Sequence, residues 1–350
     1  MQHVIQQFSE TIRKAAAEKI QLRIRGSGSK DFYGLALIGD TLDTRACTGI
    51  VSYEPSELVM TARAGAPLRD VERALSERGQ MLAYEPPHFG PDATFGGSIA
   101  SGFSGPRRAA AGSARDFVLG VRMINGLGED LRFGGQVMKN VAGYDVSRLL
   151  TGSFGTLGLL TEISVKVLPL PREERTLRFE LDEATAISTM NNWAAQPLSI
   201  SATSYLDGSL YVRLSGAAAA VGASHKKLGG EPIADDAAFW MSIREQTHPV
   251  ISNAPALWRF SIKPTSSALG LGRQVIEWNG ALRWIVADLD PAIAFKLAEK
   301  AGGHASVFRG GNKRHGIQQL SSGLLAVHKK LKRGFDPHGI FGPGRIHADF

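Results

Sequence analysis

Four glycine-dense stretches in the first half of the chain hold the residues best suited to bind phosphate. They are RGSGSK (25–30), DATFGGSIASG (92–102), KNVAGYD (139–145) and GSFGTLG (152–158). Glycine permits positive φ and close approach of another molecule, and runs of small hydroxyl-bearing residues expose adjacent N–H groups that bind phosphate oxygens. Several such loops, separated by strand-like sequence, predict one long phosphate-bearing ligand. A dinucleotide cofactor is the natural candidate.

Strand-like and helical segments lead into and out of these loops. Residues 22–24 form a short predicted strand that ends at the first glycine loop, and Leu68, Val71 and Leu75 recur at helical spacing within 67–79, where Gly79 ends the helix. Further strands are predicted at 50–53, 58–64 and 159–168, with a hairpin formed by 117–125 and 130–133. The amphipathic segment 1–21 predicts a helix rather than a signal peptide.

Two prolines, Pro169 and Pro171, mark the predicted domain boundary. Beyond them, strand-like segments such as 209–214 and 282–287 alternate with helical ones such as 291–300, which predicts an α+β second domain. A last helix is predicted at 323–334, followed by a turn-rich tail. We therefore divide the chain into the regions 1–170, 171–310 and 311–350.

The composition limits the class of protein. A chain of 350 residues with 43% hydrophobic residues can form two domains with real cores. The single cysteine, Cys47, excludes a disulfide framework and a self-contained iron–sulfur cluster, and it is interpreted as a small core residue. The net charge of +7 comes from scattered residues, which disfavours nucleic-acid binding. No apolar run reaches the roughly 18 residues of a membrane span, and the cytoplasm is the expected location.

The common nucleotide-binding motifs are missing from the glycine loops. No G-x-x-x-x-G-K-S/T sequence of a P-loop is present. The pair Gly26 and Gly28 lacks the third glycine of a G-x-G-x-x-G fingerprint because Asp31 stands there, and the pair Gly126 and Gly128 fails in the same way at Leu131. A nucleotide hydrolase and a conventional nicotinamide-binding fold are therefore disfavoured.

The same loops resemble a different family. LRIRGSGSK (22–30), ATFGGSIA (93–100) and GYDVSRLLTGSFGTLGLLTE (143–162) resemble, in order and spacing, the FAD-binding domain of the vanillyl-alcohol oxidase and para-cresol methylhydroxylase (PCMH) superfamily. The closing FDPHGIFGPGR (335–345) resembles the superfamily's C-terminal FDP…NPG(K/R) segment, with Gly342 where Asn is usual. RGSGSKDFYG (25–34), LWRFS (257–261) and IEWNGALRW (276–284) extend the resemblance to the small FAD-binding subunits, the E subunits, of bacterial glycolate oxidases.

The resemblance implies a fold and a cofactor. The fold would be α+β, with a PCMH-type FAD-binding domain of two α+β subdomains over 1–170 and a smaller α+β cap over 171–310. Residues 311–350 would form a C-terminal helix and tail that return to the FAD domain. FAD would be bound without a covalent link, because family members that tether the ring often have a histidine where this chain has Ser29. His88, close in sequence to the second loop, is interpreted as a surface or core histidine.

The resemblance also assigns residues to FAD. The first loop and 94–98 would wrap the pyrophosphate, 101–105 would follow the ribityl chain and the ring edge, and Glu162 and Ile163 would lie near the adenine. The implied cofactor-binding residues are Arg25, Gly26, Ser27, Gly28, Ser29, Lys30, Thr94, Gly96, Gly97, Ser98, Ser101, Gly102, Gly105, Glu162 and Ile163. The stretches 143–145 and 152–158 are expected to support the cofactor by packing rather than by direct contact.

The implied reaction is oxidation of a 2-hydroxy acid such as glycolate to glyoxylate, in which hydride passes to the flavin while a base removes the hydroxyl proton. Candidate carboxylate clamps are Arg259 and Arg283, and candidate bases are His304, His315 and His347, with none assigned as catalytic. The chain lacks the H-x-G-D-G-N-x-H motif that the larger flavin subunit and related dehydrogenases carry in the cap. No metal site is therefore expected.

The missing motif leads us to expect that the substrate is oxidised on the larger flavin subunit and that this chain accepts or relays electrons. An iron–sulfur relay would need a further subunit, because this chain has one cysteine. The expected partners are thus the larger flavin subunit, an iron–sulfur subunit and a small 2-hydroxy acid, with peripheral attachment at the inner face of the membrane through the complex as a second location. Two alternatives stay open: a self-sufficient PCMH-type flavoenzyme with another substrate, and a cofactor-poor assembly subunit.

Overall fold

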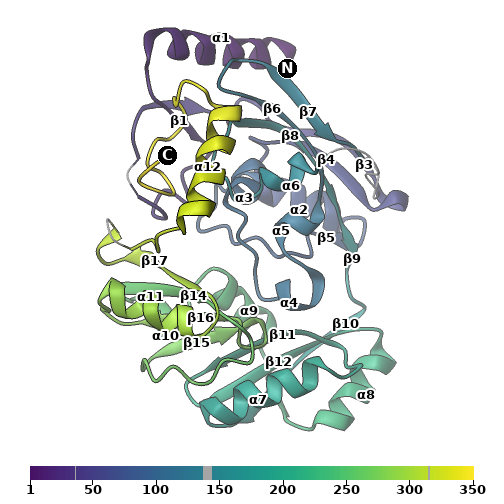
Figure 1. Cartoon of the computed structure of the whole chain (residues 1–350). Coiled ribbons are helices and arrows are strands. Elements are labelled where there is room, and N and C mark those ends of the chain that lie inside the picture. Colours follow the sequence, from purple (N-terminus) through teal and green to yellow (C-terminus); the bar gives the residue numbers. More distant parts are fainter. Residues whose placement is uncertain (36, 137–143, 314–315) are drawn as a thin grey trace. The chain divides into compact units, whose positions relative to one another are not determined.

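The computed structural model describes residues 1–35, 37–136, 144–313 and 316–350. The chain forms two compact units (Figure 1). Unit 1 comprises Met1–Phe103, Ser113–Leu170 and Gln319–Phe350, and unit 2 comprises Ser104–Gly112 and Pro171–Gln318. Helices and sheets occur in both units, so the predicted α+β class is confirmed.

The main sheet of unit 1 has five antiparallel strands in the order β3–β4–β8–β6–β7. Their bounds are β3 Ile50–Glu54, β4 Val59–Arg63, β8 Leu159–Lys166, β6 Val118–Ile124 and β7 Asp130–Gly134. The inner strands β4 and β8 are rich in β-branched and apolar residues, and Met60, Ala62, Ile163 and Val165 are fully buried in them. Helices α2 (Leu68–Ser76) and α3 (Phe95–Ser101) also belong to this unit. The predicted hairpin and helix of this region are confirmed.

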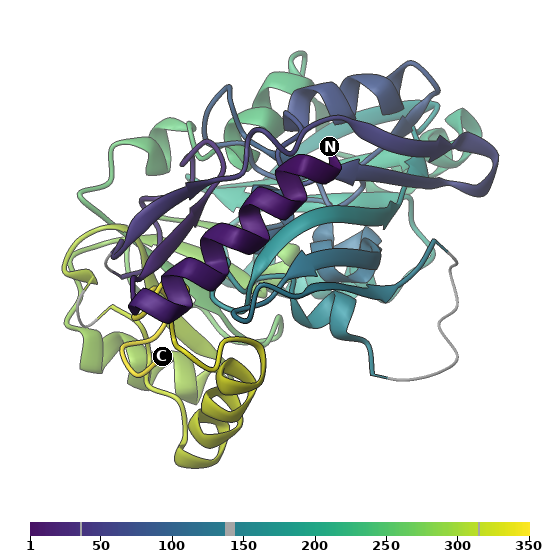
Figure 2. The same cartoon turned by 90° about the horizontal axis from the view of Figure 1, so that it is seen from above.

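A second layer of unit 1 is built on two parallel strands, β1 (Leu22–Arg25) and β2 (Asp40–Asp43). Helix α1 (Gln2–Glu18) packs on them because Ile5, Phe8 and Ile12 form one apolar face. Ile340 and Phe341 of the C-terminal tail join the same core. Figure 2 shows α1 lying over the unit. The first glycine loop therefore starts from a strand that both termini of the chain hold in place.

Short elements complete unit 1. Strands β5 (Gln80–Met81) and β9 (Leu168–Pro169) pair antiparallel, so the strand predicted over 159–168 is divided between β8 and β9. The division follows from pairing: β8 pairs with β4 up to Lys166, whereas Leu168 and Pro169 pair with Met81 and Gln80. The remaining elements are η1 Pro55–Glu57, α5 Ala114–Phe117, α6 Val146–Leu149 and α12 Ser322–Phe335.

Unit 2 is built on an eight-stranded sheet in the order β13–β10–β12–β11–β15–β16–β14–β17, in which every adjacent pair of strands is antiparallel. The strands are β13 Glu231–Pro232, β10 Glu173–Glu180, β12 Ser209–Gly216, β11 Ile200–Leu206, β15 Gln274–Glu277, β16 Leu282–Val286, β14 Ala256–Ser261 and β17 His304–Gly310. The helices of the unit are α4 Arg108–Ala111, α7 Glu183–Ala194, α8 Ala218–Leu228, α9 Asp236–Arg244, α10 Pro249–Ser252 and α11 Pro291–Lys300, with the 3-10 turn η2 Trp278–Gly280.

Two apolar cores support this sheet. One gathers Leu177, Val212 and Ile276 of the strands with Ile187 and Met190 of α7. The other gathers Trp258, Phe260 and Ile285 with Ala294 and Ala298 of α11. Consecutive residues of the inner strands β11, β15 and β16 are buried, so both faces of the middle of the sheet are shielded from solvent. The strands predicted at 209–214 and 282–287 and the helix predicted at 291–300 are confirmed.

Candidate functional site

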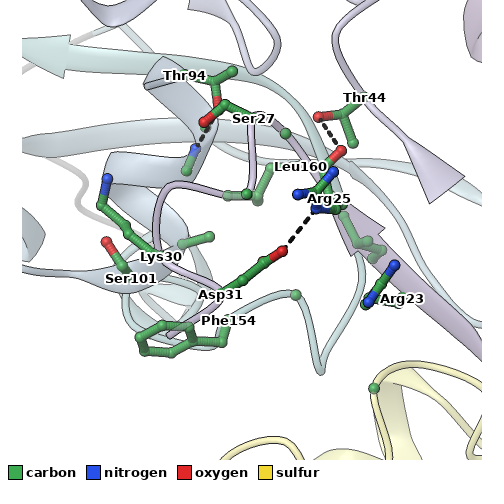
Figure 3. A pocket seen from close by; sticks show the side chains of 18 of the residues that line it. Arg23, Arg25, Ser27, Lys30, Asp31, Thr44, Thr94, Ser101, Phe154 and Leu160 are labelled. Carbon is green, nitrogen blue, oxygen red and sulfur yellow. Dashed lines mark hydrogen bonds and ion pairs between the residues drawn. The ribbon is translucent and has the colours of Figure 1, made fainter. Parts of the chain in front are cut away.

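A pocket in unit 1 brings three of the glycine-rich stretches together (Figure 3). Its walls are the first glycine loop, the start of α3, the loop before β8 and two residues of the C-terminal tail. The lining residues are Arg23, Ile24, Arg25, Gly26, Ser27, Gly28, Ser29, Lys30, Asp31, Leu37, Ile38, Thr44, Ala64, Thr94, Gly96, Gly97, Ala100, Ser101, Phe154, Gly155, Gly158, Leu160, Gly342 and Arg345. Segments more than 300 residues apart in sequence thus meet at one site.

The first loop and α3 approach each other so closely that only glycine fits at the contact. A Cβ added to Gly26 would lie 2.4 Å from the Thr94 hydroxyl oxygen. Thr94 is itself fixed, because its hydroxyl accepts a hydrogen bond of 3.2 Å from the Gly97 N–H as the N-cap of α3. Gly28 adopts a φ of +82°, which favours glycine. The close crossing therefore requires glycine at position 26, and the positive φ favours glycine at position 28.

The same loop exposes hydrogen-bond donors to the pocket. In the described part of the chain, the N–H groups of Gly26, Ser27 and Gly28 donate to no protein acceptor. Backbone donors that are partly buried and lack a protein partner are arranged to bind water or an anionic ligand. Adjacent N–H groups in a glycine loop are the pattern that binds phosphate oxygens, as predicted for this stretch.

The charges around the pocket are mostly positive. Arg23, Arg25, Lys30 and Arg345 line it, whereas Asp31 is the one carboxylate among its described lining residues. Asp31 accepts from the Arg25 Nε at 2.8 Å. Burial lowers the pKa of Arg345, and the charge of Arg23 acts in the same direction while Asp31 opposes it. An anion between these guanidinium groups would relieve their mutual repulsion.

Arg23 provides the clearest unused donor. Its terminal nitrogen donates to the Thr41 hydroxyl at 2.6 Å, whereas its Nε is buried and has no acceptor among the described residues. A buried donor on a charged group without a partner is costly unless a ligand or water satisfies it. The glycine cradle, the backbone donors and this guanidinium together fit a dinucleotide pyrophosphate, so the residues present fit FAD.

Five predicted FAD residues do not line the pocket. Ser98 is buried inside α3, where its hydroxyl donates to Phe95 O at 2.8 Å and contacts the Tyr84 hydroxyl at 3.1 Å. Gly102 ends α3 with a φ of +65°, and Gly105 belongs to unit 2, where its carbonyl accepts from Trp278 Nε1 at 3.0 Å. The remaining two, Glu162 and Ile163, lie on β8, where Glu162 faces Arg63 at 3.4 Å and Ile163 is fully buried.

The other ten predicted residues line the pocket, and the structure adds several that sequence reasoning missed. Phe154, Gly155 and Gly158 line it directly, although the stretch 152–158 was expected to act by packing alone. A φ of +51° at Phe154 is unusual for a bulky residue. Arg23 could have been found from its position in the strand that feeds the loop. Arg345 had no local signal, because only the fold brings it to the loop.

None of the candidate catalytic residues that the structure describes lines the glycine-loop pocket. Arg283 is fully buried in unit 2, where its guanidinium donates to the carbonyls of Ser266, Ser267 and Gly280. These contacts hold Arg283 in the interior of unit 2, and its interpretation as a substrate clamp stays a prediction. Burial lowers the pKa of Arg283, and Glu183 opposes the shift.

Arg259 and His304 lie on neighbouring strands of the unit 2 sheet. Arg259 is on β14, with its guanidinium 5.7 Å from the centroid of the Trp278 ring, and His304 starts β17 opposite Ser261. His347 lies in unit 1, where its ring stacks on Phe350 at a centroid distance of 5.0 Å. His315 and the stretch 139–143 lie outside the described residues. Burial lowers the pKa of His304, and the charge of Arg259 acts in the same direction, so these two candidates lie near each other in unit 2.

Two other expectations concern single side chains. Cys47 is fully buried and donates its thiol to Thr161 O at 3.3 Å, as expected for a core residue. His88 is held by Glu72 through its Nε2 at 2.9 Å. Within the described ranges, no three His, Cys, Asp or Glu side chains group into a metal site, and no helix there is long and apolar enough to cross a membrane.

Comparison with known proteins places these features in a family. The family model described as "FAD binding domain" matches residues 3–134. The glycolate oxidase subunit GlcE of Escherichia coli (strain K12) is 48% identical over 345 residues, which cover 98% of this chain and 97% of that protein. The glycolate oxidase subunit GlcD of Bacillus subtilis (strain 168) is 32% identical over 180 residues, which cover 49% of this chain and 37% of that protein.

Solved structures with low sequence identity share the fold. An alkyldihydroxyacetonephosphate synthase has a TM-score of 0.65 at 16% identity and covers 96% of this chain and 73% of its own. The 6-hydroxy-D-nicotine oxidase from Arthrobacter nicotinovorans has a TM-score of 0.61 at 15% identity and covers 99% of this chain and 90% of its own. At such identities the likeness concerns the fold alone.

Proposed function

We infer the function of this chain from the premise that it belongs to the glycolate oxidase GlcE family of FAD-binding oxidoreductases. It is accordingly an FAD-dependent oxidoreductase, and it serves as an FAD-binding subunit of a glycolate oxidase complex. A relative named as another glycolate oxidase subunit, GlcD, matches about half of the chain, which agrees with membership of a complex that has several subunits.

The pocket of unit 1 is the proposed FAD site. The observation that carries the assignment is the crossing of Gly26 and Thr94 beside N–H groups that have no protein acceptor among the described residues. We assign the pyrophosphate to residues 26–29 and to Thr94 and Gly97, with Arg23 and Arg25 as the cations that balance its charge. The apolar side chains of Leu37, Ile38 and Leu160 in the same pocket would bury ring surface.

The reaction of the complex is the oxidation of glycolate to glyoxylate, which releases two electrons and two protons. Bound FAD supplies a ring that accepts a hydride equivalent. This chain's own residues bind and orient that group, and the first loop keeps it between backbone donors and cations. We propose that the substrate is oxidised on the larger flavin subunit, because this chain lacks the H-x-G-D-G-N-x-H motif, and that this chain accepts or relays the two electrons.

We propose two partner proteins, the larger flavin subunit and an iron–sulfur subunit. The second is supported by the single cysteine, which cannot hold a cluster, so a one-electron relay needs ligands from another chain. From the family resemblance we also propose that unit 1 is the FAD-binding part and that unit 2 is the cap. The proposed location is the cytoplasm, at the inner face of the membrane where the complex attaches.

An absorbance spectrum of the purified chain, followed by anaerobic addition of glycolate, tests this assignment. We expect flavin bands that persist with the chain alone and bleach when the larger flavin subunit is added. Bleaching of the isolated chain would instead identify a self-sufficient flavoenzyme. A folded chain without flavin bands, which also fails to take up added FAD, would contradict the FAD assignment and favour an assembly subunit.

A further inference from the structure

The C-terminal tail, residues 336–350, extends the small sheet that holds the first glycine loop. Leu22 and Phe341 form a parallel bridge. The Leu22 N–H donates to Ile340 O at 2.6 Å, and the Gly342 N–H donates to Leu22 O at 2.9 Å. The tail thereby lies beside β1, three residues before the loop begins.

Arg345 forms hydrogen bonds with both ends of the segment 30–35, which follows the first glycine loop. Its guanidinium donates to Lys30 O at 3.1 Å and to Leu35 O at 3.3 Å, and its own carbonyl accepts from the Leu35 N–H at 2.9 Å. Arg345 is buried, with a relative exposure of 7%. Gly34 fits beneath it with a φ of +79°, and a Cβ there would lie 2.5 Å from Arg345 O. One residue of the tail thus holds both ends of the segment 30–35.

A buried lysine connects the tail, through hydrogen bonds, to the pocket wall formed by residues 154–158. Lys332 Nζ donates to Thr156 O, to Phe341 O and to Asp336 Oδ2, each at 2.7 Å. Asp336 in turn accepts from the N–H groups of Ile340 and Phe341 at 3.1 and 2.8 Å. Thr156 belongs to the loop that contributes Phe154, over whose ring the Arg345 guanidinium lies at 5.7 Å. The tail therefore contacts two separate walls of the pocket.

We propose that Arg345 is a positioning residue for FAD, which acts by holding the first glycine loop against the wall formed by residues 154–158. The loop itself is held by few hydrogen bonds, since residues 26–28 have no acceptor for their N–H groups within the described chain. A loop with few internal hydrogen bonds binds a ligand more tightly when its ends are fixed beforehand, because less ordering entropy is lost on binding. The inference rests on the assignment of the pocket to FAD.

Three substitutions, two at Arg345 and one at Gly34, test this proposal from the two sides of the contact. R345Q removes the fork that spans Lys30 O and Leu35 O, whereas R345K keeps the charge and reaches only one carbonyl. G34A leaves Arg345 in place but puts a methyl group 2.5 Å from its carbonyl oxygen. The matched control is G79A, because Gly79 also has a positive φ, of +66°, but nothing within 4 Å of the added methyl group. A second control, R132Q, removes an exposed arginine of β7.

The measurements are the Kd of the full-length apo chain for added FAD and the midpoint of thermal unfolding with and without FAD. We expect R345Q and G34A to raise Kd at least tenfold, R345K to give an intermediate value, and both controls to match the wild type. The rise in midpoint that FAD produces should shrink in R345Q and G34A, since that rise depends on Kd. A purely structural role would lower the midpoints with and without FAD by the same amount and leave Kd unchanged.

Failure of the FAD-site assignment and failure of the Arg345 proposal would give different results. A wild-type chain that binds no added FAD would overturn the pocket assignment. Wild-type binding combined with unchanged Kd in R345K and G34A would overturn the role of Arg345 and leave the pocket assignment intact. Should R345Q fail to fold, the Kd values of R345K and G34A, compared with that of the control G79A, still show whether Arg345 positions FAD.

Discussion

Gly26 and Thr94 lie so close together that a single added methyl group would come within 2.4 Å of the threonine hydroxyl oxygen. The hydroxyl cannot turn away freely, because it caps α3 by accepting from the Gly97 N–H. Two loops about 70 residues apart in sequence therefore meet at a contact that depends on the absence of one side chain. This crossing forms the floor of the proposed pyrophosphate site.

Replacing Gly26 by alanine should therefore weaken FAD binding more than it weakens the fold. The methyl group must push the first loop away from Thr94, and this shift moves the N–H donors of the loop. We expect at least a tenfold rise in the Kd for FAD, measured by quenching of flavin fluorescence, and a small change in Tm. Gly135→Ala is the matched control, since nothing lies within 4 Å of a Cβ there. Equal affinities for both variants would contradict the crossing.

Gly97→Arg should abolish flavin binding in a chain that stays folded. A Cβ at this position lies 2.9 Å from the Thr94 hydroxyl oxygen, and the longer side chain would enter the pocket that Gly97 lines. The same substitution at Gly222 is the control, because that residue lies on α8 with open space around it. Flavin content by absorbance and secondary structure by circular dichroism give the result. Normal flavin content in Gly97→Arg would move the site elsewhere.

The first loop could be predicted from sequence because its signal is local. Small residues and hydroxyls stand consecutively after a strand, so residues 25–30 were found without knowledge of the fold. Ser98 lies in a stretch of the same composition, but its side chain points from α3 toward Tyr84. The residue type alone does not show which way a side chain on a short helix points. Composition therefore predicts a stretch that does reach the pocket, but it does not tell which residues of that stretch face the pocket.

The far side of the pocket could not be predicted in the same way. Phe154 carries no chemical sign of ligand contact, and only the fold places it on the pocket wall, with a φ of +51°. Arg345 stands more than 300 residues from the loop that it holds, and its relation to Lys30 depends on the tail's pairing with β1. Long-range pairing of this kind has no periodicity in sequence.

Cys47 should be unreactive in the native chain. Burial raises the pKa of its thiol, so the reactive thiolate is scarce, and the side chain has no exposed surface. Because the folded pKa exceeds the unfolded one, this shift favours the folded state below the unfolded pKa, and that contribution is lost as pH rises above it. We expect no labelling by a maleimide at pH 7 and rapid labelling in denaturant. Fast labelling of the folded chain would show that the core around Cys47 opens.

Arg283 and Arg259 should respond differently to replacement by methionine. Arg283→Met leaves the carbonyls of Ser266, Ser267 and Gly280 without their donor in a fully buried place, so we expect unfolding to become easier by about 3 kcal/mol. The affinity of unit 1 for FAD should not change. Chemical denaturation and FAD titration of the purified chain measure both quantities.

Arg259→Met is the comparison that separates packing from substrate binding. Arg259 lies over Trp278 at 5.7 Å, so its loss should change the stability less than the loss of Arg283 does. If the substrate is oxidised on the larger flavin subunit, glycolate turnover by the assembled complex should keep its KM in Arg259→Met. A tenfold rise in KM without a change in Tm would instead identify Arg259 as a carboxylate clamp and place glycolate on this chain.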